Sequence, residues 1–130
     1  MKYLLIIVLL VAVLVTAGCV GENKNTVGPS KAAVTVYFFY GEECPHCHTV
    51  LPFIQNLSKK YPDVNFRILE TWHNTTNADI FSKINDQLQV PTSNRGVPEV
   101  IVVGNATPLI GSRDIPAYLE DVIIEQLKKQ

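Results

Sequence analysis

The stretch that decides the fold runs from residue 34 to residue 48 and reads VTVYFFYGEECPHCH. Its first seven residues are β-branched or aromatic, which predicts a buried strand that ends at Tyr40. A helix is expected to begin near Cys44, with Pro45 in the first turn, where proline is tolerated. Cys44 and Cys47, followed by His48, allow three chemistries: a redox dithiol, half of a metal site, or a c-type haem attachment site.

Beyond this stretch the chain alternates between helical and strand patterns. Apolar residues recur at helical spacing after the cysteines, and alternating or continuous apolar runs mark further strands. We expect a helix at 44–61 kinked by Pro52, a strand at 64–69, a helix at 77–88, a strand at 97–103 opened by Pro98, a two-residue turn at 104–105, a strand at 107–110 and a helix at 115–129. The predicted order is βαβαββα, which indicates an α/β domain.

The first residues are interpreted as a targeting or anchoring segment. Residues 3–17 carry no charge, and their number fits a signal-peptide apolar region better than a spanning helix of about 20 residues. The sequence TAGC at 16–19 resembles a lipoprotein cleavage site with Cys19 as the lipidated residue, although Thr16 stands where a branched aliphatic residue is usual. An uncleaved anchor and a secreted chain with a free Cys19 stay open. We expect a signal peptide or anchor at 1–18, a flexible tether at 19–31 and one domain at 32–130.

An exported domain changes the meaning of its cysteines. A signal peptide or an anchor would put the domain at the extracytoplasmic face of the cell membrane, where cysteine pairs form disulfides. With Cys19 assigned to the anchor, Cys44 and Cys47 remain. The loop between them is too short for a useful structural cross-link, because a disulfide stabilises more when it closes a longer loop. A reactive pair is the better interpretation.

The charge pattern excludes one class of partner. Eleven basic and twelve acidic residues are interspersed along the chain without runs. A nucleic-acid-binding domain normally carries a basic patch or stripe. We therefore expect no nucleic-acid partner.

Taken together, these motifs resemble the thioredoxin superfamily. The resemblance rests on a strand followed by Cys44 and Cys47 at a helix start, on Pro52, on the Val97-Pro98 dipeptide and on the hairpin at 100–111. It covers about residues 32–128 and implies a central mixed four-stranded sheet flanked by helices. It also implies a cis peptide bond at Pro98. The implied activity is that of a thiol:disulfide oxidoreductase, which works through a redox-active Cys44–Cys47 disulfide and needs no bound cofactor.

The chemistry of the cysteine pair agrees with this resemblance. A helix N-terminus favours a thiolate, so Cys44 is expected to attack the substrate and Cys47 to resolve the mixed disulfide. His46, with Pro45 beside it, can lower the pKa of Cys44 further and make the pair more oxidising. Glu42 or Glu43 is a candidate proton acceptor for Cys47, and the alternative interpretation is that both are solvated turn residues.

The motif Cys44-Pro45-His46-Cys47 is similar to that of DsbA-type oxidases. That likeness implies an oxidase or isomerase more than a reductase, with protein thiols and disulfides as substrates. It also implies a substrate groove at Val97 and Pro98 and a membrane redox partner that recycles the dithiol. The chain departs from DsbA-type proteins at residues 70–96, which have room for one helix instead of a large helical insertion. It departs from thioredoxins at the strand 34–40, which lacks their buried carboxylate.

Two other functions stay open on the sequence. A metal-binding or metal-delivery protein could use Cys44, Cys47 and a histidine for copper, since soft thiolates suit Cu(I). A c-type haem protein would use Cys44 and Cys47 for attachment and His48 as axial ligand, with His73 or an open site opposite. The strand-rich surroundings of the motif fit a small cytochrome poorly, and no resident metal is expected.

Overall fold

The structure is a computed structural model, and it describes residues 34–130. The predicted signal segment, the tether and the Cys19 lipidation site lie outside the described residues. The elements follow one another as β1 (Thr35–Tyr40), α2 (Pro45–Lys60), β2 (Asn65–Glu70), α3 (Thr75–Gln87), the 3₁₀ turn η1 (Thr92–Asn94), β3 (Glu99–Val102), β4 (Leu109–Ile110) and α4 (Gly111–Lys128). The predicted order βαβαββα is confirmed.

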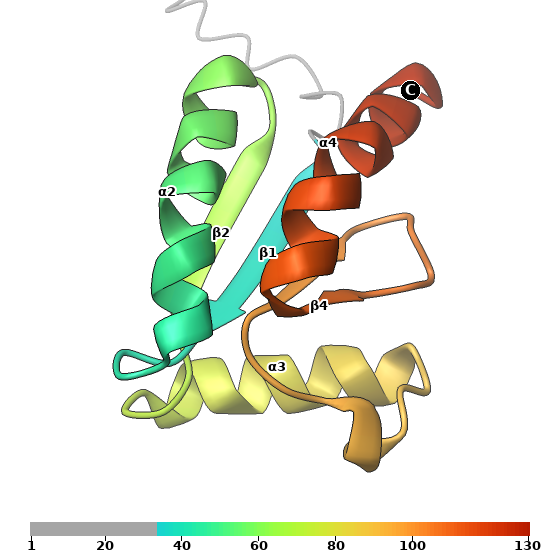
Figure 1. The fold of residues 1–130 in the computed structure, drawn as a ribbon. Helices are drawn as coiled ribbons and strands as arrows, with labels where there is room; N and C mark the ends of the chain where they lie inside the picture. Colours follow the sequence, from blue (N-terminus) through green and yellow to red (C-terminus); the bar gives the residue numbers. More distant parts are fainter. Residues whose placement is uncertain (1–33) are drawn as a thin grey trace, which may run out of the picture.

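The four strands form one mixed sheet in the order β2-β1-β3-β4 (Figure 1). β1 is parallel to β2, with Phe38 opposite Ile68, and antiparallel to β3, with Phe38 opposite Val100. β4 adds two antiparallel pairs at the far edge of β3. The parallel pair needs a crossover, and α2 supplies it.

The main core lies between the sheet and the helices α2 and α4. In Figure 1 these two helices stand side by side over one face of the sheet. On α2 the buried positions recur every three or four residues, as expected for one apolar face. The fully buried members of the core, all with an exposed fraction of 0%, are Val36, Phe38, Val50, Ile54, Val100, Ile115, Leu119 and Ile123.

The helix α3 covers the opposite face. Side chains alternate along a strand, so the neighbour of core residue Phe38 points away from α2. That neighbour, Phe39, meets Phe81 of α3 edge to face, with ring centroids 5.2 Å apart. Figure 1 shows α3 running nearly crosswise to α2 and α4. The sheet therefore has a helix layer on each side, which confirms the predicted fold class.

The predicted two-residue hairpin turn at 104–105 is wrong. The β3–β4 ladder pairs Glu99 with Ile110 and Val100 with Leu109, and the chain between these pairs forms a longer loop. The loop includes Gly104, which has a φ of +95°. Pro108 has no N–H, so it cannot donate a hydrogen bond that would extend the ladder. The strand predicted at 107–110 is accordingly reduced to two residues.

The final helix begins at Gly111, four residues before the predicted start at 115. Pro116 lies inside this helix, which runs through it and gives up one backbone hydrogen bond. Asp114 lies in the first turn, where a negative charge suits the helix dipole. Within residues 34–130, no helix is both long enough and apolar enough to span a bilayer.

Candidate functional site

The cysteine pair lies where β1 passes into α2. β1 ends at Tyr40, and a tight turn follows in which the Cys44 N–H donates to the carbonyl oxygen of Gly41 at 3.1 Å. Cys44 is the N-cap of α2, and its backbone is extended with φ −81° and ψ 111°. Pro45 occupies the first helical position, where its missing N–H leaves no intrahelical bond unmade.

Cys44 and Cys47 are joined in a disulfide, with their Cα atoms 5.2 Å apart. Both are buried, with exposed fractions of 4% for Cys44 and 1% for Cys47. The backbone N–H of Cys47 points at Cys44 Sγ, at an N–S distance of 3.2 Å. In the reduced protein this N–H and the positive end of α2 would favour a thiolate on Cys44. The two sulfurs therefore have unequal surroundings, because the Cys47 N–H and the start of α2 face Cys44 Sγ.

A segment far along the chain meets the disulfide. The carbonyl oxygen of Val97 lies 3.8 Å from Cys44 Sγ. The peptide bond between Val97 and Pro98 is cis, and the carbonyl oxygen of Pro98 accepts the N–H of Gly111 at 2.9 Å. Val97 is half-buried and Pro98 is buried. The structure thus brings Cys44, Val97 and Pro98 together.

The two histidines of the motif have different neighbours. His46 is exposed and shares a hydrogen bond of 3.4 Å with the hydroxyl of Ser112 at the start of α4. His48 Nε2 donates to the carbonyl oxygen of Glu42 at 2.6 Å, which ties the first turn of α2 to the preceding loop. His46 therefore stays at the surface beside the disulfide, and His48 braces the loop.

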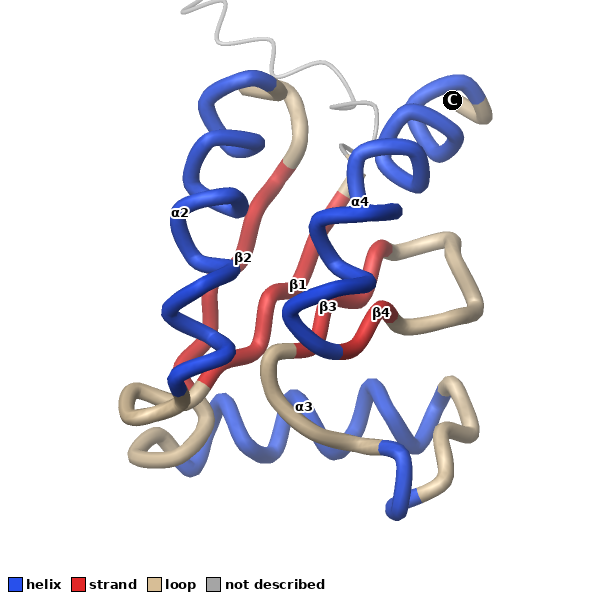
Figure 2. The backbone as a smooth tube through the Cα atoms, viewed as in Figure 1, coloured by secondary structure: helices blue, strands red, loops and turns tan. Residues whose placement is uncertain are grey.

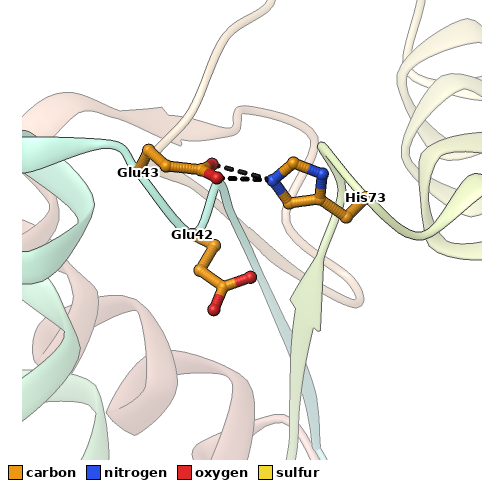
Figure 3. A group of neighbouring side chains, drawn as sticks. All are labelled: Glu42, Glu43 and His73. Carbon is orange, nitrogen blue, oxygen red and sulfur yellow. Dashed lines mark hydrogen bonds and ion pairs between the residues drawn. The ribbon is translucent and has the colours of Figure 1, made fainter.

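The Glu43 carboxylate is paired with the ring of His73. Figure 3 shows the His73 ring aimed at the Glu43 carboxylate, which accepts from Nε2 at 2.7 and 2.9 Å. The hydrogen bond and the charge of Glu43 raise the pKa of His73. Both side chains are more than half exposed. The carboxylate proposed from sequence as a proton acceptor for Cys47 is thus engaged with an imidazole.

The loop after β2 packs against the loop that leads to the disulfide, and Figure 2 shows the two loops together at the lower left. A Cβ added to Gly41 would stand 2.3 Å from Cδ2 and Cε2 of Trp72, so the indole rests on the Gly41 backbone. Trp72 still exposes 52% of its surface. Glu70 accepts the N–H groups of Trp72 and His73 at 2.7 and 2.9 Å, which fixes this loop.

Sequence reasoning missed a buried acid near the site. Glu99 opens β3 directly after Pro98, its exposed fraction is 0%, and its carboxyl accepts from Asn85 Nδ2 of α3 at 2.7 Å. The signal was present in the sequence, because Glu99 interrupts an otherwise apolar run. Acids are almost never fully buried without a partner.

One group of side chains within residues 34–130 lies close enough to share a metal ion, and it does not include the cysteines. Glu42, Glu43 and His73 can place one ligand atom each within 4.8 Å of the others. All three are exposed, and Figure 3 shows the Glu42 carboxylate turned away from the other two side chains.

Comparison with known proteins shows the fold. No family model and no curated protein matches the sequence. The structure is similar to thioredoxin from Fasciola hepatica, at 18% identity and a TM-score of 0.55, over 75% of this chain and 84% of that one. It is similar to thioredoxin NaTrxh from Nicotiana alata, at 21% identity and a TM-score of 0.52, over 74% and 76%. Thioredoxin from Trypanosoma brucei brucei matches at 22% identity and a TM-score of 0.52, over 78% and 80%. The fold is therefore thioredoxin-like.

Proposed function

We propose that this chain is a thiol:disulfide oxidoreductase that exchanges disulfides with protein substrates through Cys44 and Cys47. The observation that carries the proposal is the disulfide at the start of α2, with the Cys47 N–H 3.2 Å from Cys44 Sγ and the Val97 carbonyl oxygen 3.8 Å from the same sulfur. The thioredoxin-like fold supports it.

In the oxidising direction, a substrate thiolate attacks Cys44 Sγ. A bond forms between the substrate sulfur and Cys44, the bond between Cys44 and Cys47 breaks, and Cys47 leaves as a thiolate that takes up a proton. A second substrate thiolate then attacks the substrate sulfur of the mixed disulfide and releases the Cys44 thiolate. The substrate loses two electrons and the cysteine pair gains them. The reverse sequence reduces a substrate disulfide.

The α2 N-terminus makes Cys44 the better leaving group in the second step. The thiolate released there faces the Cys47 N–H and the positive end of the helix, and stabilising that thiolate favours the reduced form of the pair. His46, exposed beside the disulfide, can add positive charge. Pro45 and His46 thus support an oxidase or isomerase over a reductase, as in the DsbA-type proteins that the motif resembles.

The substrate would lie along Val97 and Pro98. Their segment reaches Cys44 from another part of the chain, and the Val97 carbonyl oxygen is within 3.8 Å of the sulfur that would be attacked. An extended substrate segment placed there would bring its own cysteine sulfur to Cys44.

The site of action that we propose is the extracytoplasmic face of the cell membrane. The support is the uncharged stretch at residues 3–17 and the TAGC sequence with Cys19 at 16–19. A membrane redox partner would then restore the disulfide after each turnover. Radiolabelled palmitate incorporated by the full chain and lost in Cys19→Ser would support lipidation, and a full chain that stays unlabelled would contradict it.

Trapping of mixed disulfides tests the function. Cys47→Ser removes the resolving thiol, so substrates should remain attached to Cys44 in the native compartment and be released by dithiothreitol. The matched control is Cys44→Ser, which keeps one cysteine but loses the nucleophile at the helix start. Absence of adducts with Cys47→Ser, or equal yields with the two variants, would contradict the proposal.

A further inference from the structure

We propose that Glu99 is a positioning residue for the redox site: in its uncharged form it pairs with Asn85 and holds the Gly96–Pro98 segment beside Cys44. The inference rests on the proposed function and adds to it a pH-sensitive support for the Val97 carbonyl.

Glu99 and Asn85 are both completely buried, each with an exposed fraction of 0%. Asn85 Nδ2 donates to Glu99 Oε1 at 2.7 Å and to the carbonyl oxygen of Phe81 at 3.0 Å. The amide therefore uses both of its hydrogens, one within α3 and one across to β3. The pair fastens the start of β3 to the helix on that face of the sheet.

The protonation state of Glu99 follows from the two side-chain atoms of the pair that have no hydrogen-bond partner. Within residues 34–130, the buried side-chain nitrogen and oxygen atoms without a hydrogen-bond partner are Glu99 Oε2 and Asn85 Oδ1. Both are acceptors if Glu99 is ionised, and leaving two buried acceptors unpaired is costly. A proton on Oε2 turns that atom into a donor and gives Asn85 Oδ1 a potential partner. The protonated acid and the amide can then satisfy each other.

The surroundings agree with an uncharged Glu99. Burial raises the pKa of its carboxyl, and the Asn85 hydrogen bond, the Gly96 backbone and the Arg95 charge offset only part of that rise. The guanidinium of Arg95 is itself paired with Asp86 of α3 at 2.7 Å. The sheet neighbours opposite Glu99, Phe39 on β1 and Ile110 on β4, carry no charge.

The pair acts on the redox site through two residues of backbone. Val97 is two positions before Glu99, and its carbonyl oxygen is 3.8 Å from Cys44 Sγ. Arg95 directly precedes this segment, and its ion pair with Asp86 also connects the segment to α3. Ionisation of Glu99 at alkaline pH removes the donor on Oε2 and loosens the segment at its β3 end. The Val97 carbonyl then loses its fixed place beside Cys44.

The first test is the protonation state itself. Carbon-13 labelling of Glu side chains, with the Glu99 signal assigned by its loss in Glu99→Gln, should give a Glu99 carboxyl carbon at the protonated position at pH 7. The exposed Glu125 supplies the matched signal and should be ionised at that pH. A Glu99 carboxyl that is ionised at pH 7 overturns the proposal, and this readout requires no redox activity.

The second test links the pair to Cys44. In the reduced protein, the rate of Cys44 reaction with a small disulfide should change on the order of tenfold as Glu99 ionises at alkaline pH, because small displacements near a reacting atom alter rates strongly. Glu99→Gln keeps the amide pairing without a titratable group, so it should match the wild type at pH 7 and lack the alkaline change. Glu125→Gln is the control and should retain it.

A third variant covers the case in which Glu99→Gln fails to fold. Asn85→Ala leaves Glu99 without its amide partner, and the backbone amide signals of Gly96 and Val97 should then shift at pH 7 while those of α2 stay in place. Identical alkaline behaviour in wild type and Glu99→Gln, or unchanged Gly96 and Val97 signals in Asn85→Ala, would overturn the proposal. If wild-type Cys44 reacts at no pH, the proposed function fails, and the carbon-13 and amide readouts still decide the role of Glu99.

Discussion

Gly41→Ala tests the contact between the active-site loop and the loop that carries Trp72. The added Cβ would stand 2.3 Å from two indole carbons and 2.8 Å from a third, inside the 3.0 Å that real Cβ atoms keep. The indole has to retreat by roughly 1 Å to regain ordinary van der Waals contact. Trp72 exposes 52% of its surface, so it has room to move.

The expected cost follows from two opposing effects. Overpacking costs about 1–3 kcal/mol, and the half-exposed indole places this site toward the lower end of the range. Alanine also stabilises by about 0.4–1 kcal/mol where its conformation is allowed, because it restricts the unfolded chain. We expect Gly41→Ala to lower the free energy of unfolding by about 1 kcal/mol. In a Trp72→Ala background the cost should vanish, which gives a coupling of about 1–2 kcal/mol.

Urea unfolding followed by circular dichroism measures all four proteins of this double-mutant cycle. Trp72 is the only tryptophan, so its emission in the Gly41→Ala protein also reports whether the indole has moved into water. Gly96→Ala is the matched control, because a Cβ there meets nothing within 4 Å. If the Gly41→Ala cost persists without Trp72, or equals that of Gly96→Ala within about 0.5 kcal/mol, the contact with the indole is not its cause.

Three further predictions concern the core and two ionisable groups. Ile54→Ala, at a fully buried core position, should destabilise by about 2–5 kcal/mol in denaturant unfolding, and a loss below 1 kcal/mol would contradict the packing described. Glu43→Gln should lower the pKa of His73 in an imidazole NMR titration, since Glu43 is the main cause of its rise, and an unchanged pKa would show that the pair does not form in solution. The raised pKa of Glu99 means that the native state keeps a proton which the unfolded state loses first. As the pH rises from the unfolded-state to the native-state pKa of Glu99, the free energy of unfolding of the wild type should fall relative to that of Glu99→Gln, by up to about 1.4 kcal/mol per pH unit. A pH-independent difference between the two proteins would contradict this.

The order of elements could be predicted because its segments are long and periodic. The apolar run before Tyr40 and the helical spacing of Val50, Ile54 and Leu57 leave little choice of local structure. The β3–β4 connection could not, because Gly104 and Asn105 match a two-residue turn locally. The length of that loop depends on which strand residues pair, and this is a property of the whole sheet.

The candidate site was predictable in part for a similar reason. The spacing of Cys44 and Cys47 indicates a reactive pair, and the Val97-Pro98 dipeptide was identified through the resemblance to the thioredoxin superfamily. The hydrogen bond between Glu99 and Asn85 could not be predicted from the sequence, because Asn85 lies on another element and no local pattern links the two residues. The same holds for Trp72, whose contact with Gly41 arises only when the loops after β1 and β2 meet.

The reduction potential of the Cys44–Cys47 pair tests the central claim most directly. It is obtained by equilibrating the protein in glutathione or dithiothreitol buffers and counting free thiols by mass after alkylation. An exchange-active pair should titrate reversibly between about −120 and −270 mV, and a value toward −120 mV would indicate an oxidant. A potential below about −300 mV, in the range of structural disulfides, would contradict the account.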